Sequence, residues 1–220
     1  MSENYSITVI DNLSSESSSR NYTREGVRYW IDDIRNINSA KYSNEKFDTI
    51  FHLAALARIQ PSFEDPLTYL SVDMMGTAHV LEFARMCNAN VVYAGSSSAY
   101  GGPMLNPYAY AKYTGEQICE MYTKVYGLST VTARFFNVYG ARQPVTGPYA
   151  TVVGIFEEQK KNGQQLTVTG DGEQRRDFTH VSDIVRGLYA LSHQKFSGEI
   201  FNLGTGKNYS INELACMFVS

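Results

Sequence analysis

The sequence predicts an α/β fold in which a parallel sheet is covered by helices on both faces. Short apolar runs rich in β-branched residues recur along the chain, and helical patterns separate most of them. Strands that alternate with helices are joined by crossover connections, which make neighbouring strands parallel. We therefore expect a doubly wound architecture, followed by a smaller α/β lobe toward the C-terminus.

The expected strands are short apolar runs bounded by polar or turn residues, as is typical of strands buried inside a parallel sheet. The first runs from Ile7 to Ile10 and is closed by Asp11 and Asn12. The same pattern predicts further strands at 27–31, 49–53, 90–94, 130–136, 166–169 and 199–203.

Two long helices are expected from apolar residues spaced three or four positions apart. One covers 67–81 and is opened by Asp65-Pro66, since proline is favoured in a first helical turn. The other covers 108–125, and Gly127 follows it where a C-terminal cap belongs.

The pattern changes after residue 136, where glycines and prolines cluster before an apolar segment at 150–156. A helical stripe follows at 181–191, and Ser210-Ile-Asn-Glu213 matches a capping box that opens a last helix. These changes predict a main domain of residues 1–136, to which 181–203 return, and a second lobe formed by 137–180 and 204–220.

Composition restricts the function classes. The chain has 220 residues, of which 43% are hydrophobic, and its 22 acidic and 19 basic residues are scattered, so no basic patch indicates nucleic acid or a membrane surface. Three separated cysteines and four histidines without ligand spacing favour neither a disulfide framework nor a metal site. No apolar run reaches the roughly 20 residues of a membrane helix. We expect a soluble, cytoplasmic protein without a metal.

Tyr108 and Lys112 form a Y-x-x-x-K pair, so both side chains project from one helix face one turn apart. A nearby ammonium favours a phenolate and lowers the pKa of a tyrosine from its ordinary value of about 10. The pair is a candidate proton acceptor. The spacing alone is weak, because such a pair is more often a solvated helix face.

Ser96, Ser97 and Ser98 directly follow the expected strand at 90–94. Ligands bind at the carboxyl ends of parallel strands, so these hydroxyls are candidates for binding a substrate. A plain turn explains serines and glycines in this position equally well when they are taken alone. The strand, the serine cluster and the Tyr108 helix together favour a functional site.

The serine cluster, the turn Ala99-Tyr100-Gly101 and the Y-x-x-x-K pair, in this order, resemble the extended short-chain dehydrogenases/reductases, and among them the UDP-glucose 4-epimerase-like NAD-dependent epimerase/dehydratase family. The resemblance covers nearly the whole chain and implies a Rossmann-like domain. Further segments that resemble the family's motifs in register are Asp32-Asp33-Ile34-Arg35, His52-Leu53-Ala54-Ala55, Phe135-Phe136-Asn137-Val138-Tyr139-Gly140 and Arg175-Arg176-Asp177-Phe178.

NAD is the cofactor that the resemblance implies. Asp11 ends the strand that resembles the family's second strand, where a carboxylate accepts both hydrogen bonds of the adenosine ribose and repels a 2′-phosphate. Asn12 and Ser14 follow it, with no arginine for that phosphate. The other expected cofactor contacts are Asp33 and Ile34 at the adenine, Leu53, Ala54, Ala55 and Phe135 along the cofactor, and Tyr108 and Lys112 at the nicotinamide ribose.

A nucleotide sugar, above all a UDP-hexose, is the substrate that the resemblance implies. Phenolate Tyr108 would take the O4 proton while C4 gives its hydride to NAD, and the 4-keto sugar would turn over before the hydride returns to its other face. Ser96 and Ser97 would bind or relay the O4 proton beside Ser98, and Asn137 and Arg176 would bind the diphosphate.

Two departures from the family leave alternatives open. Dehydratases of the family carry Asp-Glu directly after the hydroxyl residue, where this chain has Ser97 and Ser98, so 4-epimerisation is favoured over 4,6-dehydration or a related sugar modification. No G-x-G-x-x-G or G-x-x-G-x-x-G occurs in the 220 residues, and the family's first strand is missing. The chain is either an epimerase that takes this strand from elsewhere or a degenerate binding or scaffold protein.

Two smaller features complete the comparison with the family. Asp73 stands where the family has Asn. The helices that contain Leu67 and Tyr108 resemble those through which family members pair, so we expect a homodimer.

Overall fold

The computed structural model describes residues 5–14, 23–147, 149–193 and 196–219. At its centre lies a four-stranded sheet in the order β3-β4-β5-β9, in which all neighbours are parallel. Its strands are β3 (Thr49–His52), β4 (Asn90–Ser96), β5 (Thr130–Phe135) and β9 (Ile200–Leu203). Each lies within two residues of an expected strand at both ends, and β4 is almost wholly buried.

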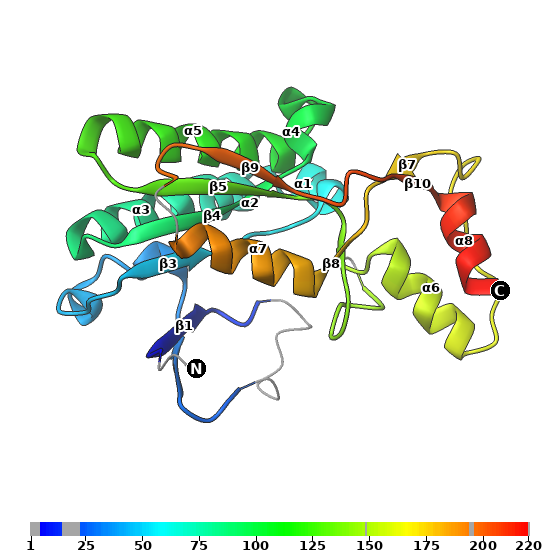
Figure 1. The fold of residues 1–220 in the computed structure, drawn as a ribbon, viewed down its shortest axis with the longest axis horizontal. Coiled ribbons are helices and arrows are strands. Elements are labelled where there is room, and N and C mark those ends of the chain that lie inside the picture. The colour runs from blue at the N-terminus through cyan, green and yellow to red at the C-terminus, as the bar shows by residue number, and fades with distance from the viewer. Residues whose placement is uncertain (1–4, 15–22, 148, 194–195, 220) are drawn as a thin grey trace.

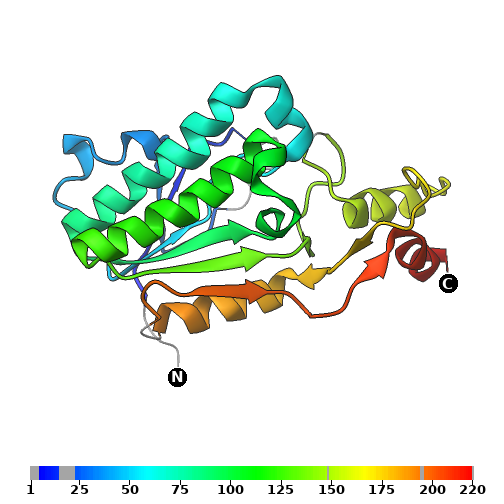
Figure 2. The same ribbon diagram turned by 90° about the horizontal axis from the view of Figure 1, so that it is seen from above.

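Helices cover both faces of this sheet, which confirms the doubly wound architecture. Figure 2 shows α3 (Gly76–Cys87) and α5 (Pro107–Tyr126) side by side over one face and α7 (Val181–His193) under the other. Two apolar clusters fill the layers. Tyr93 and Leu81 lie in the first, on the α3 and α5 side, while Val92 and Leu188 lie in the second, beneath α7.

The expected helix at 67–81 forms, but it is not regular. It starts as α2 (Pro66–Tyr69), capped by the Asp65 carboxylate, which accepts the Thr68 N–H at 3.1 Å. It then passes through a π-helical stretch, η4 (Leu70–Met75), before continuing as α3. Such π stretches are rare and often occur at functional sites.

Both ends of α5 are capped, the C-terminal one at Gly127 as expected. Asn106 caps its start, because its side chain accepts the Ala109 N–H at 2.8 Å and Pro107 follows at the first helical position. Gly127 ends it in the left-handed conformation with φ 69°. These caps fix Tyr108 in the first turn of the helix.

A separate pair of parallel strands, β1 (Ile7–Asp11) and β2 (Val27–Ile31), lies beside the central sheet. Ile10 and Trp30 from this pair and Ile50 of β3 pack into one apolar cluster, so the two sheets share a layer. Among the described residues, β1 and β3 are each hydrogen-bonded to a strand on one side only. Phe51 of β3 is 42% exposed, unlike a residue inside a parallel sheet. The edge of β3 that faces away from β4 is therefore unpaired within the described residues.

The second lobe lies at one end of the sheet (Figure 1). Its apolar cluster joins α6 (Val152–Lys161) to α8 (Ile211–Val219). The expected capping box forms at the start of α8: Ser210 N–H donates to the Glu213 carboxylate at 2.8 Å, and Glu213 N–H donates to Ser210 Oγ at 3.0 Å. The short strands of this region are β6 (Val138–Tyr139) with β8 (Thr179–His180), and β7 (Arg175–Arg176) with β10 (Tyr209–Ser210).

One expected strand is wrong. Residues 166–169 form no strand, because local side-chain hydrogen bonds take the place of a ladder. Gln159 of α6 accepts the Thr167 N–H at 3.1 Å and donates to Thr167 Oγ1 at 2.8 Å. The remaining short elements are η2 (Ile34–Asn36), η3 (Ala40–Tyr42), α1 (Ile59–Glu64), α4 (Ser98–Gly101) and η5 (Pro103–Leu105).

α7 packs on the main sheet, and β9 extends that sheet beside β5. The division of the chain at residue 136 stays a prediction. Within the described ranges, no helix combines the length and the apolar character needed to cross a bilayer.

Candidate active site

Three of the expected site residues are joined by hydrogen bonds at the carboxyl end of β4. Ser96 is the last residue of that strand, and its Oγ accepts a hydrogen bond from the Tyr108 hydroxyl at 3.3 Å. The Ser98 hydroxyl donates to the same Ser96 Oγ at 2.9 Å. The third serine, Ser97, is held through its backbone, whose N–H donates to the Phe135 carbonyl at 3.1 Å. The strand end and the first turn of α5 therefore build one hydroxyl cluster.

Lys112 lies one helical turn beyond Tyr108 and is only 5% exposed. Its ammonium is 4.4 Å from the centre of the Tyr93 ring, a cation–π contact that partly replaces lost hydration. Burial lowers the pKa of Lys112, and the carboxyl group of Asp73 opposes that change. Lys112 is thus a buried amine whose pKa is lowered by desolvation and partly restored by Asp73.

The pKa of Tyr108 differs from the expectation based on its spacing from Lys112. Burial raises it, while the Ser96 hydrogen bond lowers it, Asp73 raises it and Arg58 lowers it. The net shift is upward, so this arrangement favours the phenol over the phenolate. The cause is desolvation, which the sequence does not reveal.

Asp73 sits in the π-helical stretch η4 beside this cluster and is 1% exposed. Its Oδ1 accepts the Leu56 N–H at 2.7 Å, and its Oδ2 has no hydrogen-bond partner among the described residues. Burial raises the pKa of Asp73 to about 6, although Lys112 and the Leu56 N–H act in the other direction. Asp73 therefore links the loop after β3 to the Tyr108 helix.

The expected adenosine-binding residues also come together, at the ends of β1 and β2. Asp11 ends β1 and is exposed. Asn12 donates from Nδ2 to Asp33 Oδ2 at 3.2 Å and accepts the Ser14 N–H at 3.1 Å. Arg35 holds Asp33 by a pair of side-chain hydrogen bonds and keeps the pKa of that carboxyl near 2. Arg35 therefore holds Asp33 in place, while Asp11 is exposed.

The other expected cofactor residues differ in accessibility. Leu53 is 52% exposed and Ala54 is exposed, so both offer apolar surface where β3 ends, and Ala55 is half-buried beside them. Ile34 is 6% exposed and packs against Gly76, so its side chain belongs to the core. Phe135 ends β5, in register with Ser96.

Asn137 and Arg176, the expected diphosphate ligands, are exposed at the junction with the second lobe. Asn137 has a left-handed backbone, with φ 34°, and donates from its side chain to the Asp177 carbonyl at 2.9 Å. Arg176 donates to the carbonyl of Arg175 at 2.8 Å. The Asp177 contact brings the two expected ligands into one neighbourhood, but no described contact joins them to Tyr108.

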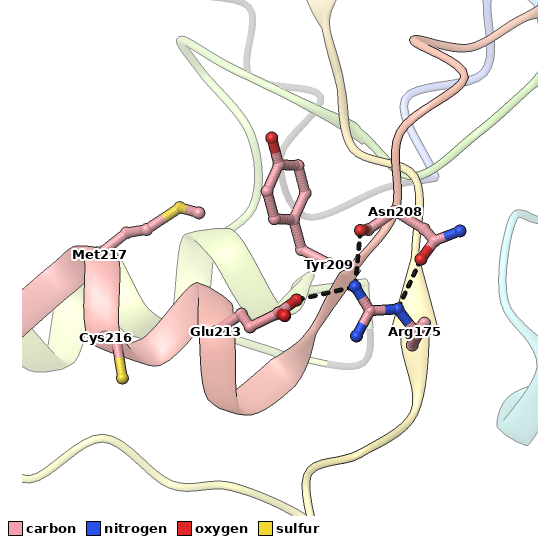
Figure 3. A pocket seen from close by; sticks show the side chains of 6 residues that line it. All are labelled: Arg175, Asn208, Tyr209, Glu213, Cys216 and Met217. Carbon is pink, nitrogen blue, oxygen red and sulfur yellow. Dashed lines mark hydrogen bonds and ion pairs between the residues drawn. The ribbon is translucent and has the colours of Figure 1, made fainter.

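A surface hollow in the second lobe is a poor candidate for the chemistry (Figure 3). It is lined by Arg175 and by residues around the start of α8. The guanidinium of Arg175 is already bound by Asn208 at 2.5 Å and by Glu213 at 2.9 Å. These bonds connect β7 to α8, so we assign Arg175 a structural role.

Arg58 is a residue that the sequence reasoning missed. It is half-buried, and its guanidinium donates to the Tyr149 carbonyl. Among the ion pairs of the described residues, none includes Arg58. A signal was present, because a single arginine closes the otherwise apolar run Leu53 to Ala57 directly after a strand.

The sequence profile of the NAD dependent epimerase/dehydratase family matches residues 1–204. The chain belongs to this family. A putative UDP-glucose 4-epimerase of Methanocaldococcus jannaschii is 33% identical to it over 227 aligned positions, covering 96% of this chain and 72% of the relative.

Solved structures of other proteins give the same result for this family member. A UDP-glucose 4-epimerase from Thermotoga maritima, crystallised with UDP-glucose, is 30% identical, has a TM-score of 0.90, and is matched over 97% of this chain and 74% of its own. The enzyme WbmF of Bordetella bronchiseptica, crystallised with NAD⁺, is 27% identical with a TM-score of 0.81 over 96% and 68% of the two chains. The Rossmann-like fold is thereby confirmed.

This family member is an enzyme of nucleotide-sugar modification, and its cofactor is NAD. The described residues fit the cofactor at three places. Exposed Asp11 suits the adenosine ribose. Leu53 and Ala54 offer apolar surface directly after β3. Lys112, without an ion-pair partner among the described residues, suits the nicotinamide ribose.

Proposed function

We propose that the chain is a UDP-hexose 4-epimerase that oxidises the sugar transiently at C4. The observation that carries this proposal is the hydrogen bond from Tyr108 to Ser96, with Lys112 one turn away. It supports proton transfer at one sugar hydroxyl, because two hydroxyls share a proton path at the end of a central strand.

Each residue has a distinct part in the proposed reaction. Tyr108 accepts the O4 proton and later returns it, while Ser96 shares that proton and orients O4. Lys112, one turn along the same helix, supplies a positive charge that favours the phenolate, and the Ser96 hydrogen bond acts in the same direction. Asp11 binds the adenosine ribose, and Asn137 and Arg176 bind the substrate diphosphate. NAD, when bound, supplies the acceptor for the C4 hydride and the donor that returns it.

The serine cluster favours epimerisation over dehydration. Elimination of water needs an acid and a base at neighbouring carbons, and positions 97 and 98 carry hydroxyls. Asp73, which interacts electrostatically with Tyr108, is 1% exposed and accepts the Leu56 N–H, so its carboxylate is not available to a sugar carbon. A 4,6-dehydratase or a non-catalytic scaffold has no comparable support.

Chromatography of UDP-glucose and UDP-galactose after incubation with the protein and NAD tests the proposal. Interconversion that is lost in Tyr108→Phe supports it. The matched control is Tyr110→Phe, which removes an exposed hydroxyl two positions along the same helix. Accumulation of a dehydrated 4-keto product would contradict it, and so would equal activity in both variants.

We also propose that the enzyme is a cytoplasmic homodimer that pairs through the helices containing Leu67 and Tyr108. Leu67 and Val125 are exposed apolar residues on these helices, and pairing would bury them. Light scattering that gives only monomer mass at micromolar concentration contradicts the dimer. Fractionation of cells that recovers the protein outside the cytosol contradicts the location.

A further inference from the structure

Arg58 is a half-buried cation whose charge is not matched by a neighbouring carboxylate. It is the residue before α1, and its guanidinium donates to one backbone carbonyl, that of Tyr149. Burial lowers the pKa of Arg58, but an arginine remains charged at any physiological pH. A guanidinium has five donors, and a partly desolvated one is costly unless an anion pairs with it. No ion pair in the described part of the chain includes Arg58.

The position of Arg58 points to the reacting end of the substrate. Arg58 directly precedes α1, and α1 packs against α5, the helix that carries Tyr108. The guanidinium also interacts electrostatically with Tyr108 and with Tyr69. The ring of Tyr69 packs edge-on against Tyr108, with centroids 6.5 Å apart. Arg58 thus belongs to the surroundings of the phenol to which we assign the O4 proton.

The geometry of a hexose identifies the group that would lie there. C6 is attached to C5, the direct neighbour of C4, so an oxygen on C6 lies close to O4. The nucleotide diphosphate is attached at C1, across the ring from C4. A cation beside Tyr108 therefore suits a charge at C6 better than the diphosphate, for which Asn137 and Arg176 remain available.

We infer that Arg58 binds a carboxylate at C6, and that the substrate is a nucleotide-linked uronic acid. The inference rests on the proposed 4-epimerase function. Arginine and carboxylate form two parallel charge-assisted hydrogen bonds, which a neutral CH₂OH group cannot replace. A neutral hexose leaves the guanidinium unpaired and is bound less tightly.

Calorimetric titration with UDP-glucuronate and with UDP-glucose, each in the presence of NAD, tests the inference without requiring turnover. Wild type is expected to bind the uronate at least about 10-fold more tightly, in line with the strength of hydrogen bonds to charged groups. Arg58→Gln keeps polar donors and loses the charge, so its affinity for UDP-glucuronate falls about 10- to 100-fold while its affinity for UDP-glucose changes less than about 3-fold. Arg58→Lys recovers part of the loss.

Arg176→Gln is the matched control, because the loss of a diphosphate ligand weakens both sugars equally. Equal losses for both sugars in Arg58→Gln overturn the inference, as does a fall in NAD affinity of the same size. Wild type that epimerises UDP-glucose but binds the uronate no better also overturns it and leaves the epimerase proposal standing. Wild type that binds both sugars and epimerises neither refutes the proposed function instead.

Discussion

Asp73→Asn should stabilise the protein at neutral pH. The side chain is 1% exposed and carries one unpaired oxygen, so folding penalises its charged form. Its pKa is about 6, against an ordinary value of 3.8. A difference of about 2 pH units corresponds to about 3 kcal/mol of unfolding free energy, at about 1.4 kcal/mol for each pH unit. Asparagine removes this penalty and still accepts the Leu56 N–H.

The sign of the effect depends on pH in a defined way. Below pH 3.8, Asp73 is protonated in both the folded and the unfolded chain, so the penalty is absent. As the pH rises from 3.8 to about 6, the unfolded chain loses this proton while the folded chain retains it, and the penalty grows. Above pH 6 the penalty is complete, since both states are ionised.

Urea unfolding of wild type and Asp73→Asn at about pH 4 and pH 7.5 measures this difference. We expect a gain of up to about 3 kcal/mol at the higher pH and almost none at the lower. Asp73→Ala is the control, because it removes the same charge but leaves the Leu56 N–H unpaired and gains less. A gain that is the same at both pH values, or a loss at pH 7.5, would refute the reasoning.

Three further substitutions test the site and the core. Tyr108→Phe should lower kcat by about 10²- to 10⁴-fold, the usual contribution of a general base, with little change in the urea midpoint. Glu116→Gln should lower the unfolding free energy by about 3 kcal/mol, because the Glu116 carboxylate is buried and lies 2.6 Å from the partly buried guanidinium of Arg134, which would lose its counter-charge. Gly115→Ala should lower the unfolding free energy by about 2 kcal/mol. A Cβ atom at residue 115 would lie 2.2 Å from the hydroxyl of Tyr93, which is fully buried.

Each of these predictions has an internal check. Gly101→Ala adds the same methyl group where no atom lies within 4 Å, so its urea midpoint should hardly change. Arg134→Met combined with Glu116→Gln removes the lone charge and should restore most of the stability lost in the single variant. If Tyr108→Phe retains full activity, or if both alanine variants are equally stable, the corresponding assignment is wrong.

The regular elements were accessible from the sequence because their signals are local. Strand β2 agrees with the expected 27–31, and the caps of α5 at Asn106 and Gly127 confirm a start and an end that turn chemistry predicts. The false strand at 166–169 shows the limit. Its composition suits a strand, but a strand also needs a neighbouring strand to pair with. Here the side chain of Gln159 accepts the Thr167 N–H instead.

The candidate site, too, was predicted from the sequence only in part. The sequence placed Ser96 and Tyr108 at one strand end, and their hydrogen bond agrees with that placement. It did not predict the direction of the Tyr108 pKa, because desolvation depends on what packs around the phenol. Arg58 was missed for the same reason: its place after an apolar run is visible in the sequence, but its burial near Tyr108 is not.

The sequence by itself determined the family, the doubly wound sheet and the order of the motifs, because periodicity, caps and short motifs are properties of neighbouring residues. Only the tertiary structure decided which charges share one desolvated space. Asp73, Arg58 and Lys112 lie far apart along the chain, and they act on Tyr108 or on one another because packing removes the water that would otherwise screen them. The physical reason is that electrostatic coupling depends on distance and burial in three dimensions, and neither can be read from sequence spacing.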